Sequence, residues 1–307
     1  MRTTPGLFLR MKPATTYEEQ YSKLLSRGLL IPSKDRVISF LKENNYYRFT
    51  GYAKLYTKPD SDDFIDGLTF DKLFNIYTFD SELRAIINVM VAQIEVTVRT
   101  QLAYNLSNNI SPYCYKNKII FSDENFFKET NKIIENEIKK ASDEPMIKHF
   151  AGKQKPFWVI IEILSFGVVS KLYANLLTEN KKLVSSGTYY NINYEYFGNY
   201  LNVCTSIRNN CAHRARLYGK TFTTAPRFSK KEKKKYGDPT IVDNYFITNG
   251  SSTSLFECIY ACMKLIIKPK NKKKYINMFS KLIAKYNSDI ELTKIGFPKN
   301  WKEILIS

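Results

Sequence analysis

Histidine is scarce in this chain. Its 307 residues include only two, His149 and His213. The five cysteines are an odd number with no C-x-x-C spacing, so neither a disulfide framework nor a zinc knuckle is indicated. A Walker phosphate loop, a glycine-rich dinucleotide fingerprint and a carboxylate–histidine cluster with metal-ligand spacing are also missing. These absences give no support to a metal- or nucleotide-dependent enzyme, and we expect neither a cofactor nor a metal.

Long apolar segments are missing as well. The longest, residues 157–169, is too short to cross a bilayer and contains Glu162. No apolar run follows the basic residue near the N-terminus, so no targeting segment is indicated. With 44% hydrophobic and 14% aromatic residues, the chain can bury a substantial core. We therefore expect a globular, cytoplasmic protein with reduced thiols and no contact with the membrane.

Acidic residues are too few to balance the basic ones. The chain has 47 Lys and Arg against 29 Asp and Glu, a formal charge of +18. Such an excess favours a polyanionic partner, and RNA is the natural candidate. The alternative is that lysine coats the surface because the encoding genome is rich in A and T. The clustering of the basic residues favours RNA, because residues 220–236 contain seven of them with one acid, and residues 268–274 contain five lysines with no acid. These two segments are predicted to face phosphates, and their RNA-binding lysines are Lys230, Lys231, Lys233, Lys234 and Lys235, and Lys272, Lys273 and Lys274.

Glycine and proline are absent from residues 70–107, where apolar residues recur at three- and four-residue steps. This pattern predicts one long helix, or two in near-continuity. Further helices are predicted over residues 17–27, 33–45, 123–140, 156–177, 194–218, 251–267 and 272–287. Residues 52–56 and 242–247 are the only segments with a strand pattern. The predicted fold is therefore all-α, a multi-helix bundle with a helical C-terminal extension and minor β structure at most.

Several local signals refine this prediction. Thr16 and Glu19 predict a capping box, and Gly28 stands where a C-terminal cap belongs. Glu95 and Arg99 have the spacing of a modest surface ion pair. Gly167, inside the predicted 156–177 helix, indicates close packing against a neighbour.

The most informative segment is residues 206–213, Ser-Ile-Arg-Asn-Asn-Cys-Ala-His, because it places Arg208 five positions before His213 in a predicted helix. At about 100° per residue, Cys204 and Cys211 fall on the apolar face and are predicted to be buried. Asn209 and His213 fall on the opposite face, with Arg208 at the border of the apolar stripe. A polar face without Lys or Glu is unusual for a helix that meets only water, so it predicts a cleft or an interface.

The chemistry of these residues suits RNA cleavage without a metal. That reaction needs a base for the ribose 2′-hydroxyl, an acid for the leaving oxygen, and positive charge for the transition state. His213 can be base or acid, Arg208 can carry the charge, and Asn209 can orient the imidazole or bind phosphate. One such histidine per chain does not readily perform both proton transfers, so a homodimer with a shared groove is predicted. The alternative is a structural pair, in which Arg208 binds a carboxylate and His213 is a surface group.

Six segments of the chain resemble phage abortive-infection proteins of the AbiD and AbiF type, and the resemblance covers residues 12–301. The six segments are IRNNCAHRARLY, NNYYRFTGYA, YTFDSELR, IEVTVRTQLAY, FWVIIEILSFG and GFPKNW. The resemblance implies membership of the all-helical HEPN superfamily. Active members are metal-independent ribonucleases with an arginine, four to six residues and a histidine, and their sites are composite between two copies. Here the spacer is four residues. Relatives often have a second histidine after the motif and then an asparagine, whereas this chain has Arg214 and Gly219, so we expect substrate positioning to differ.

The leading hypothesis is an endoribonuclease toxin of an anti-phage system that leaves 2′,3′-cyclic phosphate and 5′-hydroxyl ends. The alternative is a non-catalytic module that captures a structured noncoding RNA. The resemblance also implies a small noncoding RNA as antitoxin or regulator. We assign Arg208, His213 and Asn209 to catalysis, and Arg214 and Arg216 to RNA binding with the lysines above. Residues 1–219 are predicted to form the domain with the motif, and residues 220–307 a basic loop and C-terminal helices packed on the same body. His149, Cys258 and Cys262 are predicted to be structural.

Overall fold

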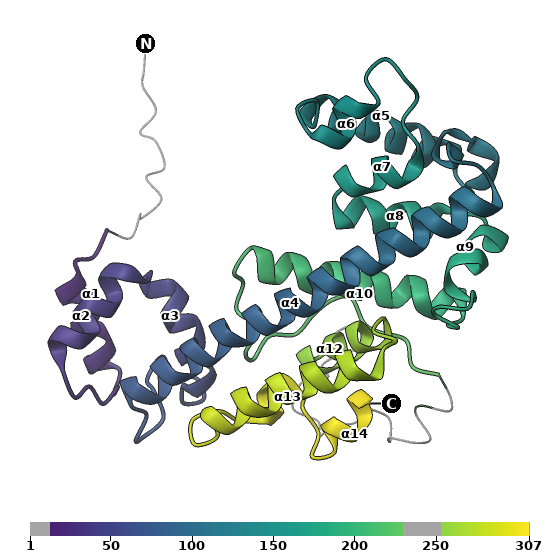
Figure 1. Cartoon of the computed structure of the whole chain (residues 1–307). Helices are drawn as coiled ribbons and strands as arrows, with labels where there is room; N and C mark the ends of the chain where they lie inside the picture. Colours follow the sequence, from purple (N-terminus) through teal and green to yellow (C-terminus); the bar gives the residue numbers. More distant parts are fainter. Residues whose placement is uncertain (1–12, 230–231, 233–252, 307) are drawn as a thin grey trace, which may run out of the picture. The chain divides into compact units, whose positions relative to one another are not determined.

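The computed structural model describes residues 13–229, 232 and 253–306, and these residues are predominantly helical (Figure 1). Their β structure is limited to four isolated bridges. The predicted all-α class is therefore confirmed. The chain forms two compact units, Met1–Phe79 and Asp80–Ser307, and the long helix α4 (Phe70–Asn109) contributes residues to both. The predicted division after residue 219 remains a prediction.

The first unit contains α1 (Tyr17–Ser26), α2 (Lys34–Glu43), α3 (Tyr46–Ala53), the 3-10 turn η1 (Lys54–Tyr56) and the start of α4. The predicted capping box is present: the Thr16 hydroxyl accepts from the Glu19 N–H, and the Glu19 carboxylate accepts from the Thr16 N–H. Gly28 follows α1 with a left-handed φ of 86°, as a C-terminal cap requires. The predicted strand at residues 52–56 is wrong, because this segment ends α3 and forms η1. The second predicted strand, residues 242–247, lies outside the described residues.

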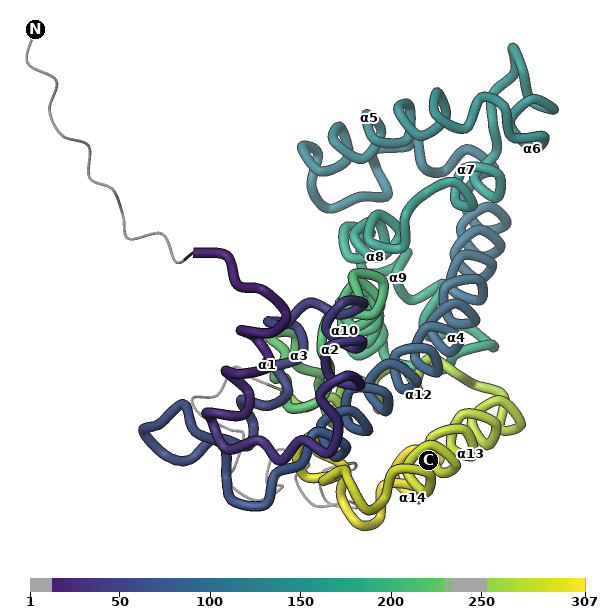
Figure 2. The backbone as a smooth tube through the Cα atoms, turned by 90° about the vertical axis from the view of Figure 1, so that its left-hand side faces the viewer, coloured from purple at the N-terminus to yellow at the C-terminus, as the bar shows by residue number. Residues whose placement is uncertain are grey.

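The second unit contains the rest of α4 and the other helices of the described residues. These are α5 (Glu124–Lys140), α6 (Pro145–His149), α7 (Phe157–Ile163), α8 (Phe166–Asn175), α9 (Thr178–Ser185), α10 (Tyr194–Ala212), α12 (Leu255–Lys264), α13 (Pro269–Lys285) and α14 (Trp301–Ile306), with short 3-10 turns η2 (Cys114–Lys116), η3 (Lys118–Ile120) and η4 (Leu292–Ile295). Within this unit α5 and α6 lie at the end remote from α13 and α14 (Figure 2).

Two predicted helices end earlier than their periodicity indicated. The segment 156–177 is broken at Leu164, which is extended, and Ser165 then caps α8 with its side chain. A Cβ added at Gly167 would lie 3.9 Å from the Thr205 side chain on α10, an ordinary van der Waals distance, so α8 packs against α10 there without requiring a glycine. The tight contact is at Gly198 on α10, where an added Cβ would lie 3.2 Å from the Tyr173 ring. The motif helix ends at Ala212 instead of reaching residue 218.

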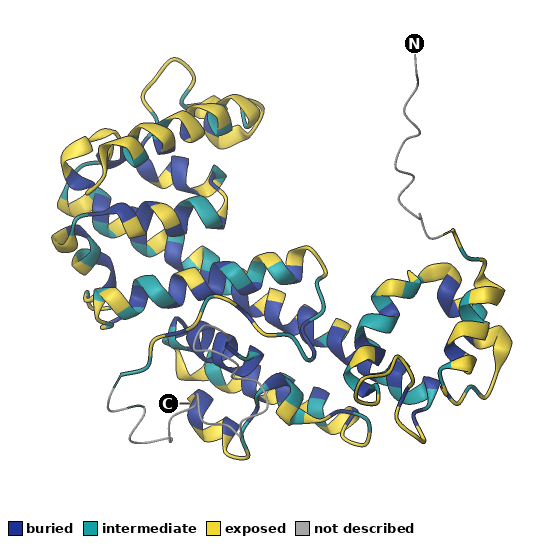
Figure 3. Cartoon of the chain, turned by 180° about the vertical axis from the view of Figure 1, so that it is seen from behind, coloured by how far each residue is buried: buried dark blue, intermediate teal, exposed yellow. Residues whose placement is uncertain are grey.

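The core of the second unit lies where α10 packs against α8, α9 and α12. Every residue of α12 from Leu255 to Met263 is buried, so this short helix is dark blue over most of its length in Figure 3. All five cysteines are free and buried, which confirms the core positions predicted for Cys204, Cys211, Cys258 and Cys262. Burial raises the pKa of the Cys211 thiol to about 12. It therefore stays protonated at neutral pH and behaves as a small hydrophobic side chain.

Candidate active site on helix α10

Helix α10 presents the motif residues on a rigid frame. Its N-terminus is capped by the Asn193 side chain, and its apolar face is buried as predicted. Asn209 and His213 are exposed, and Arg208 is partly exposed. The motif residues thus line the solvent side of a helix whose other side is fixed in the core.

Arg208 lies beside a carboxylate that another arginine holds in place. Its Nε is 4.0 Å from Glu95 Oε2 on α4, and its Nη1 donates to Asn209 Oδ1 at 3.3 Å. Arg99 Nη2 binds Glu95 Oε1 at 2.6 Å and donates to the Leu164 carbonyl at 2.7 Å. The predicted pair of Glu95 and Arg99 is therefore confirmed, but these side chains are only 14% and 13% exposed, so its predicted place on the surface is wrong. The pair is a partly buried anchor to which Arg208 is added at the solvent edge.

His213 lies at the C-terminal end of α10. It is the C-cap of α10, and its backbone N–H bonds to the Asn209 carbonyl at 3.0 Å. Arg214 then adopts a left-handed φ of 54°, which ends the helix. Among the described residues no hydrogen bond or ion pair occupies the exposed imidazole. Its ring is therefore accessible to a ligand.

A single chain does not direct Arg208 and His213 to the same side of α10. Five residues of α-helix separate the two positions by about 140° around the axis and about 7.5 Å along it. Arg208 is turned towards Glu95, while His213 and Asn209 lie one turn apart on the exposed face. Arg208 and Asn209 are joined by their own hydrogen bond. Asn209 therefore stands between the other two proposed catalytic residues: it is bonded to Arg208, which faces Glu95, and it lies one turn from His213 on the exposed face.

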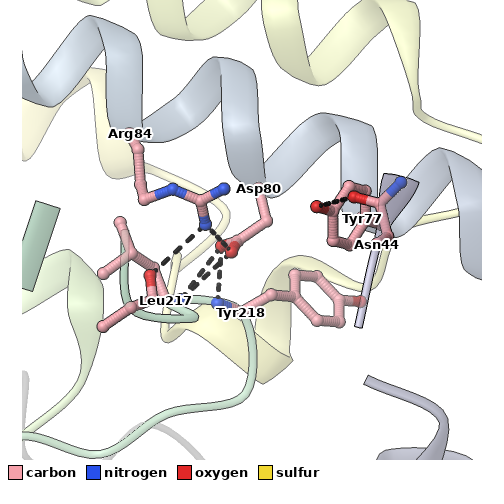
Figure 4. A network of polar contacts seen from close by, with 7 residues as sticks. Asn44, Tyr77, Asp80, Arg84, Leu217 and Tyr218 are labelled. Atoms are coloured by element: carbon pink, nitrogen blue, oxygen red, sulfur yellow. Dashed lines mark hydrogen bonds and ion pairs between the residues drawn. The ribbon is translucent and has the colours of Figure 1, made fainter. Parts of the chain in front are cut away.

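The turn that follows His213 is held by a buried ion pair (Figure 4). Asp80, fully buried on α4, pairs with Arg84 and accepts the N–H groups of Leu217 at 3.1 Å and Tyr218 at 2.8 Å. Arg84 Nη1 also donates to the Ala215 carbonyl at 3.3 Å. The network therefore fixes the backbone directly after the motif.

We did not predict the buried pair of Asp80 and Arg84, although the sequence contains a signal for it. Asp80 and Arg84 are four residues apart and fall on the same helical face as the apolar residues of the 70–107 pattern. Two charged residues at core positions indicate a buried pair that needs further partners. Their partner, the backbone after His213, is more than 130 residues away in the sequence.

The residues predicted to bind RNA are in different environments. Arg214 is exposed and Arg216 is partly buried, both directly after the motif. Lys273 and Lys274 are exposed on α13, whereas Lys272 is partly buried. The predicted lysines Lys230, Lys231, Lys233, Lys234 and Lys235 lie outside the described residues. His149, at the end of α6, is exposed, with its ring edge-on to Phe150 at 4.9 Å between centroids.

No described helix combines the length and apolar character that crossing a membrane requires. In the same part of the chain, no group of three or more His, Cys, Asp or Glu side chains is arranged to hold a metal ion.

Comparison with known proteins gives the family. Residues 39–219, more than half of the chain, match the Abi-like protein family, and this range includes α4, α10 and the whole motif. No curated protein and no solved structure matches the chain. The family indicates a role in abortive-infection defence, whereas assignment to the HEPN superfamily remains a prediction. The helical chain that carries Arg208 and His213 therefore belongs to the Abi-like protein family.

Proposed function

We propose that this protein is a metal-independent endoribonuclease that acts as the effector of an abortive-infection system. The observation that carries the proposal is the exposed His213 at the end of a fixed helix, with Asn209 one turn before it and Arg208 bonded to Asn209. These residues supply a titratable base, a phosphate ligand and a permanent positive charge. Family membership supports the biological context.

In the proposed reaction His213 takes the proton of a ribose 2′-hydroxyl, whose oxygen attacks the adjacent phosphorus. The bond from phosphorus to the 5′ oxygen breaks, and that oxygen receives a proton from a second acid. Arg208 stabilises the charge that develops on the phosphoryl oxygens. The products are a 2′,3′-cyclic phosphate and a 5′-hydroxyl, and DNA is not a substrate because it lacks the attacking hydroxyl.

The second acid in this proposal is the partner's His213 in a homodimer. An uncharged face of α4 supports such an assembly. Between residues 80 and 109 the exposed side chains of α4 include no charged residue: they are Ser81, Ala85, Asn88, Val89, Ala92, Val96, Thr100, Tyr104, Asn108 and Asn109. We call these ten residues the α4 stripe. A long uncharged face is unexpected on a chain with a formal charge of +18, and it suits self-association about a two-fold axis.

The position of the α4 stripe also favours a shared site. Glu95, which contacts Arg208, follows Ala92 and precedes Val96 on the same helix and lies at the margin of the α4 stripe. A second copy bound to the α4 stripe would lie next to Glu95 and therefore close to Arg208. The dimer proposed here thus explains how an arginine and a histidine that diverge within one chain can serve one phosphate.

The alternative is a module that binds a structured RNA without cleaving it. The contact of Arg208 with Glu95 favours this function, because an arginine that neutralises a carboxylate has less charge to offer a transition state. The basic residues Arg214 and Arg216 after the motif serve binding equally well in either case.

The test is cleavage of a labelled single-stranded RNA in the presence of EDTA. We expect wild-type protein to cleave, and His213→Ala to lose at least about 100-fold in rate, the lower end of a general acid–base contribution. Asn202→Ala is the matched control, since Asn202 is an exposed amide on the same helix. Equal rates for wild type and His213→Ala would exclude His213 as the catalytic base. Binding by both proteins with cleavage by neither would favour the RNA-binding alternative.

A further inference from the structure

A second candidate site lies at the other end of α10. A pocket of about 320 Å³ opens between the N-terminal half of α10, the end of α12 and the start of α13. Its lining includes Ile192, Tyr196, Tyr200, Lys264, Ile267 and Lys272. We call it the α10–α13 pocket. Tyr196 precedes Arg208 by twelve residues, about 18 Å of helix, so the pocket is separate from the motif.

One lysine of the pocket is already neutralised. Lys264 Nζ lies 2.8 Å from Glu232 Oε1, and the Glu232 carboxylate also accepts from the Tyr260 hydroxyl and from the Ser229 N–H. Burial raises the pKa of Glu232, but these donors outweigh it and lower the pKa to about 2. The Glu232 carboxylate is therefore ionised at neutral pH, and it is already bound by Lys264, Tyr260 and Ser229.

The other lysine, Lys272, has no counter-ion among the residues that the structure describes. In the described part of the chain no hydrogen bond or ion pair reaches the Lys272 ammonium. Burial, followed by the charge of Lys264, lowers the pKa of Lys272 to about 8. Lys272 is thus mostly charged at neutral pH, in a place where its charge is poorly solvated. A bound anion would relieve this cost, so Lys272 is positioned as an anion receptor.

The rest of the lining is suited to a flat, partly apolar group. Ile192 and Ile267 provide aliphatic surface, and the partly exposed Tyr196 ring lies 6.2 Å from the Tyr200 ring. The volume is at the lower end of the range for small-ligand sites, about 300–1,000 Å³. A ligand that combines one anionic group with one ring system matches both the charge and the size.

We propose that the α10–α13 pocket binds a single nucleotide, with its phosphate on Lys272 and its base against the Tyr196 ring. The nucleotide can be a free nucleoside monophosphate or the phosphate-bearing terminal nucleotide of an RNA, since both present the same groups. Binding here does not depend on the cleavage reaction proposed for Arg208 and His213.

The first experiment is calorimetric titration of the full chain with the four nucleoside 5′-monophosphates, a nucleoside and inorganic phosphate. We expect at least one monophosphate to bind at least about tenfold more tightly than the nucleoside or phosphate alone. Lys272→Gln should weaken that binding at least about tenfold, because it removes a charged donor. Lys281→Gln, the same change at an exposed lysine further along α13, should leave it unchanged. Tyr196→Leu should remove the preference for monophosphate over phosphate, and Tyr196→Phe should keep it.

Titration across pH gives an independent readout. Affinity should fall above about pH 8, where Lys272 loses its proton. Among the described residues, the other charged or titratable groups facing the pocket are Lys264, Glu232, Tyr196 and Tyr200. Thermal unfolding tests whether the variant folds. Because Lys272→Gln removes a partly buried charge, its melting temperature should be no lower than that of wild type.

The second experiment identifies the source of the nucleotide. RNA oligomers with a 5′-phosphate, a 3′-phosphate or hydroxyl ends are titrated into His213→Ala protein, and each is repeated with Lys272→Gln added. A Lys272-dependent preference for a phosphorylated end assigns the pocket to RNA termini. Binding of free monophosphate without any end preference assigns it to free nucleotides. If neither free monophosphates nor phosphorylated ends bind in a Lys272-dependent way, the proposal is overturned.

Discussion

The carboxylate of Asp80 accepts the backbone N–H of Tyr218 at 2.8 Å, although 137 residues of chain separate the two. The same carboxylate binds Arg84, and both side chains are buried. This contact ties the segment after the motif to α4. The position of His213 at the end of α10 therefore depends on a residue far from it in the sequence.

Removing the Asp80 carboxylate should destabilise the second unit strongly. Asp80→Ala leaves the Arg84 guanidinium and two backbone N–H groups buried without their acceptor, and we expect a loss of about 3–5 kcal/mol in the free energy of unfolding. Urea denaturation followed by circular dichroism measures it. Glu124→Ala is the control, because Glu124 forms an exposed pair with Lys128 and should cost no more than about 0.5 kcal/mol. Similar losses in the two variants would contradict a structural role for Asp80.

The carboxylate of Glu95 should position Arg208. In Glu95→Gln the neutral amide no longer attracts either guanidinium. Arg208 loses its ion-pair partner at 4.0 Å, and Arg99 loses the carboxylate that it binds at 2.6 Å. We expect the rate of RNA cleavage to fall about tenfold, because a misplaced charge stabilises the transition state less well. The rate at saturating RNA is the readout. Glu129→Gln, on the exposed face of α5, is the matched control and should keep the wild-type rate. A faster reaction in Glu95→Gln would show that Glu95 restrains Arg208 instead of positioning it.

The α4 stripe should mediate self-association. Val96 is 59% exposed at its centre, so Val96→Glu places a charge inside the proposed interface without disturbing the core. We expect the dissociation constant of the dimer, measured by sedimentation equilibrium, to rise at least about tenfold, since an unpaired charge is costly to bury. RNA cleavage at low protein concentration should fall in parallel. Ile119→Glu, a change at a residue that is 74% exposed elsewhere in the unit, should alter neither. Undiminished association of Val96→Glu would remove the α4 stripe as the interface.

The lysines after the motif should contribute to RNA affinity and not to the chemical step. Changing Lys233, Lys234 and Lys235 to Gln should weaken binding of single-stranded RNA. Each lost phosphate contact makes the negative slope of log affinity against log salt shallower by about 0.7. The cleavage rate at saturating RNA should stay close to that of wild type. A variant with the wild-type affinity and slope would support the alternative that these lysines only coat the surface.

The ion pair between Glu232 and Lys264 should make stability depend on pH. The pKa of Glu232 is about 2 in the folded protein, below the ordinary value of 4.5, so the folded state favours the ionised carboxylate. This stabilisation is present above pH 4.5 and is lost as the pH falls towards 2. At pH 7, Glu232→Gln should lower the free energy of unfolding by about 1–2 kcal/mol, a figure reduced for partial solvent screening. Urea denaturation at pH 7, 4.5 and 3 should show the difference from wild type shrinking, and a constant difference would contradict this origin.

Much of the fold was predictable because it rests on contacts between near neighbours. The capping box of Thr16 and Glu19 joins residues three apart, and the helix of residues 70–107 follows from a periodic pattern without glycine or proline. The buried positions of Cys204 and Cys211 followed from the same periodicity. The motif itself was visible in the sequence, because Arg208 and His213 are close along one helix.

The errors arose where distant contacts compete with local pattern. Residues 156–177 are apolar enough for one helix, yet the chain extends at Leu164, whose carbonyl accepts from Arg99 on α4. The pattern around residues 213–218 continues that of α10, but Asp80 takes the N–H groups of Leu217 and Tyr218 away from helical bonding. Periodicity describes which face of a segment is apolar and carries no information about which distant group will bind its backbone.

The sequence by itself therefore determined that this protein is an all-α member of the Abi-like family with an arginine and a histidine on one helix. Only the tertiary structure decided the charge environments: the carboxylate of Glu95 beside Arg208, the anchor of Asp80 behind His213, and the partly buried Lys272 in a pocket. The physical reason is that helix formation and burial depend on residues a few positions apart. The charge environment of a site depends on which helices meet, and that is fixed only when the core packs.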